Sequence, residues 1–258
     1  MMAQTYMQAA AEVARLAGDC ALGFFGTEIL IEAKSDGSPV TIADKSAERV
    51  ARTWIEERFP SDGISGEEFG ERAETGKHRW IIDPIDGTKS FIRGVPLWGT
   101  LVAVADGERV IAGAAFFPAL AELIVAALGE GCWWNDRSCS VSSVADLATA
   151  LVLTSELPFV GESARGWEEL SRRAAVSRTW GDSYGYLLVA TGRAEVMVDP
   201  VVSEWDIAPF RPIISEAGGV FSDWNGAMTP RSGNAIATNS ALAIEARDIL
   251  GAKIGERK

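Results

Sequence analysis

Apolar residues recur with helical spacing in the first part of the chain. An N-terminal helix is predicted by the apolar positions that share one of its faces: Val13, Leu16, Ala17, Cys20, Ala21 and Phe24. Gly26 is expected to end this helix. A second helix is predicted to start at Thr41, because Thr41-x-x-Asp44 matches a capping box that satisfies the free amides of a first turn. Pro60 should end the second helix.

Shorter apolar runs between glycine and proline residues predict strands. We expect a short strand at residues 29–32 and a buried strand at residues 80–82. Pro84 should end the buried strand, because proline lacks the amide hydrogen that a central strand needs. Three further runs predict an antiparallel meander at residues 101–105, 110–115 and 121–127.

Helical and strand patterns alternate in the second half of the chain. Strands are predicted at residues 151–154, 194–198, 220–223 and 235–238, and helices at residues 164–174, 183–191, 204–217 and 241–250. Such alternation favours an α/β arrangement. We therefore expect an N-terminal α+β half at residues 1–142 and a C-terminal α/β half at residues 143–258. The two halves should pack closely as one functional unit with a cleft between them.

Composition and charge argue against several functions. The chain has 258 residues, and 24 Lys and Arg against 36 Asp and Glu give a formal net charge of −12. This balance argues against a partner such as nucleic acid, whose phosphate backbone needs a basic surface, and it suits a protein that concentrates cations. The chain has one histidine, His78, which excludes zinc and iron sites that need two imidazoles. We assign His78 no role.

Cysteine usage and hydropathy bear on the location of the protein. The three cysteines, Cys20, Cys132 and Cys139, are scattered without a C-x-x-C motif, which predicts reduced thiols in a cytosolic protein. The longest apolar run, at residues 111–121, is too short to span a bilayer, and no targeting segment is visible. We expect a soluble cytoplasmic protein with no membrane partner.

Acidic residues at the ends of predicted elements form the most informative pattern. Asp83 follows the buried strand, and Asp86 lies beyond the turn expected at Pro84, so both side chains can point into the same cleft mouth. Two close carboxylates resist joint ionisation unless a cation lies between them. Oxygen ligands without histidine suit Mg²⁺ or Mn²⁺. Glu67 and Asp206 are candidates for a third and a fourth ligand.

Each of these residues also has a purely structural interpretation. Asp44 can be only the capping-box carboxylate, and Asp206 fits a second box, Ser203-x-x-Asp206, at a helix start where acids are favoured. Glu67 can belong to a solvated loop. Asp83 is the hardest to explain in this way, because an unpaired acid in a core costs about several kcal/mol in desolvation.

Three motifs carry a family resemblance: Gly66-Glu67-Glu68, Asp83-Pro84-Ile85-Asp86-Gly87-Thr88, and Glu204-Trp205-Asp206 followed by Glu216-Ala217-Gly218-Gly219. In order and in spacing they resemble the inositol monophosphatase family, and the resemblance covers nearly the whole chain. It implies a layered α-β-α-β-α sandwich, often a homodimer. The implied activity is Mg²⁺-dependent hydrolysis of a small phosphate monoester, with Mn²⁺ as a second possible metal.

The resemblance also implies roles for individual residues. The metal ligands would be Glu67, Asp83, Asp86, Asp206 and the carbonyl oxygen of Ile85. The catalytic residues would be Glu67, Thr88 and Asp44, the last two orienting a metal-activated water that attacks phosphorus. The substrate would contact Asp86, Gly87, Thr88, Gly181, Asp182, Ser183, Asp199 and Asp206. No covalent intermediate with the enzyme is required.

Residues near these motifs narrow the choice of substrate. Lys89-Ser90-Phe91 and the segment 180–186 resemble the histidinol-phosphate phosphatase branch of the family and depart from its inositol-specific members. Histidinol phosphate carries an ammonium group and an imidazole, which carboxylates of the substrate motifs would complement. Trp98 or Trp180 could offer an apolar or cation–π face, although core packing is the safer interpretation of both in a chain with nine tryptophans. The alternatives are inositol 1-phosphate, another sugar phosphate, or a regulatory member that binds a protein partner.

A polar loop at residues 34–38 carries Lys34, Asp36 and Gly37. Loops of this composition can move, and the resemblance places the corresponding loop near the cleft. The sequence leaves open whether the loop closes over the site.

Overall fold

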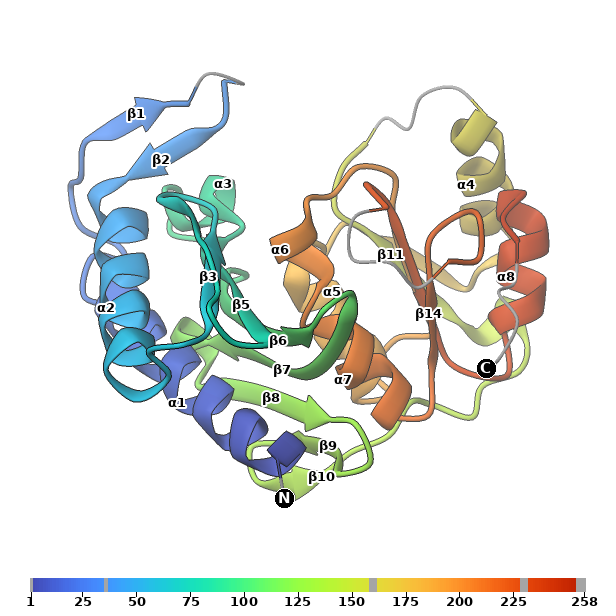
Figure 1. Ribbon diagram of the computed structural model, residues 1–258. Helices are drawn as coiled ribbons and strands as arrows, with labels where there is room; N and C mark the ends of the chain where they lie inside the picture. The colour runs from blue at the N-terminus through green and yellow to red at the C-terminus, as the bar shows by residue number, and fades with distance from the viewer. Residues whose placement is uncertain (1, 35–36, 158–161, 228–231, 254–258) are drawn as a thin grey trace.

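Two large β-sheets alternate with layers of helices (Figure 1). The computed structural model describes residues 2–34, 37–157, 162–227 and 232–253. Across these residues the layers follow the order helix, sheet, helix, sheet, helix. The predicted α-β-α-β-α sandwich, an α+β fold, is therefore confirmed.

The first sheet has eight strands within the described residues. They are β3 (Gly63–Gly66), β4 (Gly70–Arg72), β5 (His78–Asp86), β6 (Gly99–Asp106), β7 (Arg109–Phe117), β8 (Glu122–Ala127), β9 (Gly131–Trp134) and β10 (Arg137–Ser138). Their order is β10-β9-β8-β7-β6-β5-β3-β4, and only β3 and β5 pair in parallel. The meander predicted from the sequence is β6, β7 and β8.

Helices α1 (Met2–Leu22) and α2 (Ile42–Arg58) cover the outer face of this sheet. Successive side chains of a strand point to opposite faces, so Val102 and Val104 of β6 pack toward α1 and α2 while Leu101 packs on the other side. The buried stripe of α1 is rich in alanine, which lets the helix lie close to the strands. Leu16, predicted to lie on this stripe, is instead 40% exposed.

The second sheet has five strands among the described residues. They are β11 (Leu151–Thr154), β12 (Val176–Arg178), β13 (Val196–Asp199), β14 (Val220–Ser222) and β15 (Ala235–Thr238), in the order β12-β11-β13-β15-β14. Helices α5 (Ser183–Ala190) and α7 (Phe210–Glu216) lie between the two sheets, and α4 (Glu162–Arg173) and α8 (Ala243–Leu250) cover the far face. One apolar cluster, which includes Phe117, Leu187, Met197 and Phe210, joins both sheets through the middle helices.

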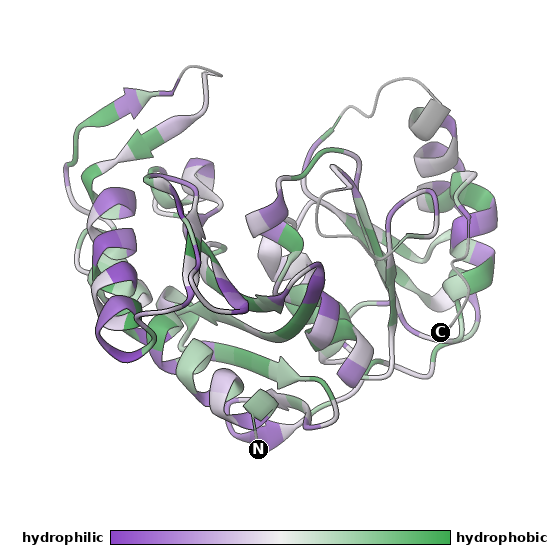
Figure 2. Ribbon diagram, in the orientation of Figure 1, coloured by the Kyte–Doolittle hydropathy of each residue, from purple (hydrophilic) through white to green (hydrophobic). Residues whose placement is uncertain are grey.

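Short elements complete the chain. The hairpin of β1 (Ile31–Ala33) and β2 (Pro39–Thr41) precedes α2, and the single turns are α3 (Thr88–Phe91), η1 (Pro118–Leu120), η2 (Leu147–Thr149) and α6 (Glu204–Ile207). Figure 2 shows apolar residues concentrated on the strands and polar residues on the outer turns of α2. None of the described helices is long and apolar enough to cross a membrane.

The strand that was expected to end at Pro84 continues to Asp86. The pairing of β5 with β6 shifts register between Asp83 and Asp86, so Pro84 lies in a bulge where no ladder hydrogen bond is required of it. The Pro84 carbonyl accepts a hydrogen bond from Thr100 Oγ1 at 2.8 Å. The prediction was wrong because a bulge tolerates proline, and this bulge bends the end of the strand that carries both acids.

The helix predicted at residues 204–217 is divided into α6 and α7. Pro209, which has no amide hydrogen to donate to the preceding turn, lies at the break. The break packs tightly against β7, because a Cβ atom at Gly113 would lie 2.2 Å from the Pro209 carbonyl oxygen. The short helix α6 is thereby held over the end of β5.

Candidate active site

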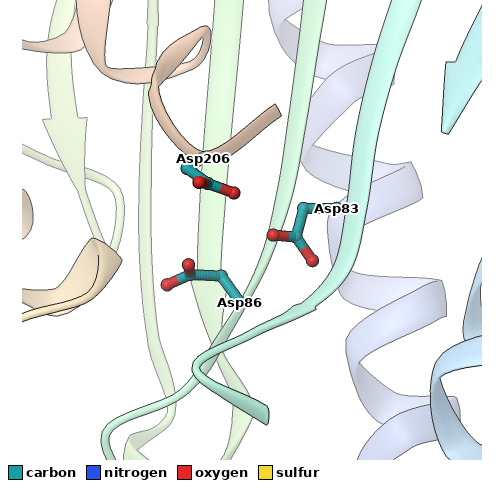
Figure 3. Close-up of side chains that lie close together, drawn as sticks. All are labelled: Asp83, Asp86 and Asp206. Atoms are coloured by element: carbon teal, nitrogen blue, oxygen red, sulfur yellow. The ribbon is translucent and has the colours of Figure 1, made fainter. Parts of the chain in front are cut away.

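Three carboxylates from distant parts of the chain meet at the end of β5 (Figure 3). Asp83 and Asp86 flank the bulge, and Asp206 lies in the single turn of α6. One oxygen of each lies within 4.8 Å of the others. They line a cavity of about 220 Å³ whose other walls are Ser38, Pro39, Glu67, Ile85, Gly87, Thr88, Lys89 and Asp182. The structure thus brings together three acids that the sequence singled out.

Burial and mutual repulsion make these acids hard to ionise. Burial raises the pKa of Asp83 well above its ordinary value, and the neighbouring carboxylates of Glu67, Asp86 and Asp206 raise it further. Burial, followed by Asp86, raises the pKa of Asp206 to about 8. Burial and then Asp182 raise the pKa of Asp86 to about 8, although a hydrogen bond from Ser183 lowers it. All three groups can be ionised near neutral pH only if a cation compensates their charge.

The donor atoms fit a hard divalent cation. The three acids, the Glu67 carboxylate and the Ile85 carbonyl offer only oxygen, the ligand that Mg²⁺ and Mn²⁺ prefer. Glu67 lines the same cavity, but its Oε1 atom accepts a hydrogen bond from Lys34 Nζ at 2.6 Å. An ammonium group therefore already contacts one side of this carboxylate. The acidic cluster could hold a metal, as the sequence predicted.

The geometry of Asp44 fits both roles that the sequence left open, a helix cap and a partner of Thr88. The predicted capping box is confirmed, since Asp44 Oδ2 accepts from the Thr41 amide at 2.8 Å and from Thr41 Oγ1 at 2.7 Å. Its other oxygen, Oδ1, lies 3.4 Å from Thr88 Oγ1. The Thr88 hydroxyl also lies 3.0 Å from the Ile85 carbonyl oxygen, so it is placed between the two candidate acceptors. Asp44 is buried, and burial raises its pKa.

Gly87 provides the turn that closes this wall of the cavity. Its φ of 80° lies in the left-handed region that favours glycine, and α3 begins directly after it. A Cβ atom at Gly87 would lie 3.1 Å from both the Leu97 carbonyl oxygen and Asp182 Oδ2. A side chain here would therefore press on both halves of the chain at once.

Residues of the second half reach the site through α5. The Ser183 amide donates to Asp86 Oδ2 at 2.7 Å, which ties the start of α5 to a predicted metal ligand. Gly181 packs directly on Ser155, where a Cβ atom would lie 2.2 Å from the Ser155 Cα atom. Asp182 precedes α5 with a φ of 47°, an unusual value for a residue other than glycine. Asp182 lies on the cavity wall.

Asp182 and Asp199 differ in how their carboxylates are used. The buried Asp199 carboxylate accepts from the Ser155 amide at 3.1 Å and from Tyr186 Oη at 2.7 Å. No hydrogen bond between the described residues reaches the Asp182 carboxylate, which makes no capping contact to α5. Burial, then Asp199, raise the pKa of Asp182 to about 6. Of the two carboxylates, Asp182 is therefore the one that is open to the cavity, and Asp199 is already bound by Ser155 and Tyr186.

Three ion pairs at the site, made by the two basic residues Lys34 and Arg79, were missed by sequence reasoning. Lys34 Nζ lies 2.6 Å from carboxylate oxygens of both Glu67 and Glu68. Arg79 at the start of β5 binds both carboxylate oxygens of Glu204, at 2.6 and 3.2 Å, and so ties the strand of Asp83 to the helix of Asp206. Nothing in the local pattern points to a pair so far apart in the chain.

The remaining sequence predictions have mixed outcomes. Trp98 is fully buried and packs on Phe91, which excludes it as a face for a ligand. Trp180 is 45% exposed and stays available. Ser38 lines the cavity and Lys34 contacts Glu67 on its wall, whereas Asp36 of the same loop lies outside the described residues.

The raised pKa values predict that stability of the metal-free protein falls with rising pH. Asp86 and Asp206 have pKa values of about 8 when folded against an ordinary value of 3.8. The stabilisation that these two groups contribute to the free energy of unfolding is complete below pH 3.8 and is lost as the pH rises through about 8. We expect the Tm measured in EDTA to fall over this range. At a hundredfold excess over its Kd, Mg²⁺ should raise the Tm by roughly 5–10 °C, and more at pH 8 than at pH 5.

The control for this experiment is the same Tm measurement with NaCl, at equal ionic strength, in place of the magnesium salt. A Tm in EDTA that is flat from pH 5 to 8 would show that the three acids are not coupled to folding in this way.

Comparisons with known proteins agree with this geometry. The sequence model that describes the inositol monophosphatase family matches residues 2–252 of this chain. A histidinol-phosphatase from Chlorobaculum parvum is 41% identical over 240 residues, which are 92% of this chain and 93% of that protein. An inositol-1-monophosphatase from Rhizobium meliloti is 30% identical over 97% of this chain and 94% of its own length. The crystal structure of the extragenic suppressor protein SuhB from Bartonella henselae superposes with a TM-score of 0.90, at 27% identity, over 95% of this chain and 98% of that one. The chain therefore belongs to the inositol monophosphatase family and is a phosphatase.

Proposed function

We propose that this phosphatase depends on Mg²⁺ and hydrolyses histidinol phosphate to histidinol and phosphate. The observation that supports this substrate best is the Asp182 carboxylate, which lines the cavity without a hydrogen bond from any other described residue. Such a group attracts a substrate whose alcohol portion is cationic. The similarity to a histidinol-phosphatase at 41% identity, against 30% for an inositol-1-monophosphatase, supports the same choice.

Asp83, Asp86, Asp206, Glu67 and the Ile85 carbonyl would hold the metal in this proposal. When bound, Mg²⁺ or Mn²⁺ supplies positive charge to the phosphate oxygens and lowers the pKa of a bound water. Since Asp83, Asp86 and Glu67 come from the first half of the chain and Asp206 from the second, we propose that residues 1–142 and 143–258 act as one unit.

Thr88 and Asp44 would orient the attacking water. The Thr88 hydroxyl can accept a hydrogen bond from this water while it donates one to Asp44 Oδ1 or to the Ile85 carbonyl. Asp44 is held by the capping box of α2, so its carboxylate cannot swing away. Gly87 would let the backbone approach a phosphoryl group closely, because glycine carries no side chain.

The alcohol portion of the substrate would lie against Asp182. Its ammonium group would pair with the Asp182 carboxylate, and Asp199 would add to the negative potential from behind Ser155. Trp180, next but one to Asp182 in the chain, offers an exposed ring for the imidazole.

A phosphate-release screen tests this function. The purified chain is assayed with Mg²⁺ on histidinol phosphate, inositol 1-phosphate and fructose 1,6-bisphosphate, and again after EDTA treatment. We expect the highest kcat/KM for histidinol phosphate and no release in EDTA. Release from inositol phosphate alone would overturn the substrate, and release that survives EDTA would overturn the metal dependence.

A further inference from the structure

Two cysteines of the β9–β10 hairpin lie side by side. Cys132 is in β9, Cys139 directly follows β10, and the Cys139 amide donates to the Cys132 carbonyl at 3.1 Å. Their Sγ atoms are 3.4 Å apart. Directly opposite, hydrogen-bonded residues of antiparallel strands have Cα atoms about 5.5 Å apart. This separation falls inside the range of about 4.4–6.8 Å that a disulfide bridges.

We propose that Cys132 and Cys139 are a redox-sensitive pair that forms a reversible disulfide when a hydroperoxide oxidises the chain. This inference does not depend on the proposed function. The turn between the strands, Asn135 and Asp136, already has the positive φ angles (45° and 63°) of a two-residue hairpin. The 3.4 Å between the two Sγ atoms and the fixed register of the hairpin place the sulfur atoms within reach of each other.

The surroundings of the pair assign different roles to the two thiols. Cys132 is buried, whereas Cys139 is only half-buried and open to a small oxidant. A hydrogen bond with Cys132 lowers the pKa of Cys139, burial opposes this, and the charge of Arg193 lowers it again. Arg193 is fixed by an ion pair with Glu122 at 2.7 Å and by the face of Trp134 at 4.7 Å. Cys139 has the lowered pKa and the greater exposure, so it is assigned as the attacking thiol and the buried Cys132, whose pKa is raised, as the resolving thiol.

The oxidation balances with hydrogen peroxide as the oxidant. The Cys139 thiolate attacks one peroxide oxygen, the O–O bond breaks, and the hydroxide that leaves takes up a proton to form water. Cys139 is now a sulfenic acid. The Cys132 sulfur attacks the Cys139 sulfur, the S–S bond forms, and hydroxide departs with the Cys132 proton as a second water. The two thiols lose two electrons and the peroxide gains them. A dithiol reductant reverses the change.

Thiol counting on the full chain tests the proposal. The reduced protein is exposed to stoichiometric hydrogen peroxide, then denatured and titrated with a thiol reagent. We expect the count to fall from the three thiols of the sequence to one, with a mass loss of two hydrogen atoms. Peptide mapping should link Cys132 to Cys139, leave Cys20 free, and show full recovery with dithiothreitol.

Three variants provide matched controls. Cys20→Ser should still form the link, and Cys139→Ser should not. Cys132→Ala keeps an apolar side chain in the core and should leave Cys139 as a sulfenic acid that dimedone traps. Three titratable thiols after oxidation, a link that includes Cys20, or sulfinic acid on Cys139 with Cys132 still reduced would each overturn the proposal.

Discussion

Replacement of Asp83 by asparagine should lower phosphate release by at least about a thousandfold while the protein stays folded. A metal that neutralises charge in the transition state contributes several kcal/mol, and each 1.4 kcal/mol corresponds to about a factor of ten in rate. Asparagine removes the charge of the central acid but keeps its shape. Its amide oxygen can still accept the hydrogen bond that the Ile85 amide now gives to Asp83 Oδ1 at 3.0 Å. Steady-state kinetics with saturating Mg²⁺ measure the loss.

Stability separates loss of chemistry from loss of fold in this variant. The pKa of Asp83 is raised well above its ordinary value, so its ionisation destabilises the metal-free protein as the pH rises. Asp83→Asn should therefore have a higher Tm than the unchanged chain in EDTA at pH 8, and weaker Mg²⁺ binding by calorimetry. Asp106→Asn, an exposed acid at the far end of the β5–β6 pairing, is the matched control and should keep full activity. Turnover retained by Asp83→Asn would rule out the metal-centred scheme.

The parts of the fold that the sequence predicts are those set by neighbours in the chain. The capping box of Thr41 and Asp44 depends on residues within one helical turn, and it was read correctly. The meander of β6 to β8 follows from apolar runs separated by short turns. Asp83 was recognisable because an acid directly after a run of buried apolar residues needs a partner.

The parts that the sequence does not predict are set by contacts between distant residues. A proline is expected to end a central strand, and only the pairing of β5 with β6 shows that Pro84 lies in a bulge. In the sequence, Arg79 and Glu204 look like ordinary charged residues of the surface. In the folded chain they form an ion pair that joins the elements carrying Asp83 and Asp206. The difference between a satisfied Asp199 and an open Asp182 likewise depends on Ser155 and Tyr186, which no spacing rule connects to them.

Replacement of Asp182 by asparagine should weaken the action on histidinol phosphate about 10- to 100-fold in kcat/KM. A hydrogen bond to a charged group contributes about 1.5–3 kcal/mol, and a contact to the non-reacting part of a substrate acts mainly through KM. The kcat/KM of the same variant for inositol 1-phosphate, whose alcohol portion is uncharged, should fall only slightly. The measurement is the ratio of kcat/KM for the two substrates in the variant and in the unchanged chain.

An equal loss with both substrates would contradict the proposed role of Asp182 and point to the metal ligands instead. The reason is that the Asp182 carboxylate raises the pKa of Asp86, so its removal also changes the charge felt at the acidic cluster. That effect acts through the metal and cannot distinguish a cationic alcohol from a neutral one. Saturating Mg²⁺ suppresses it, because full occupancy no longer depends on affinity. A substrate-dependent loss under these conditions therefore comes only from contact between Asp182 and the charged part of the substrate.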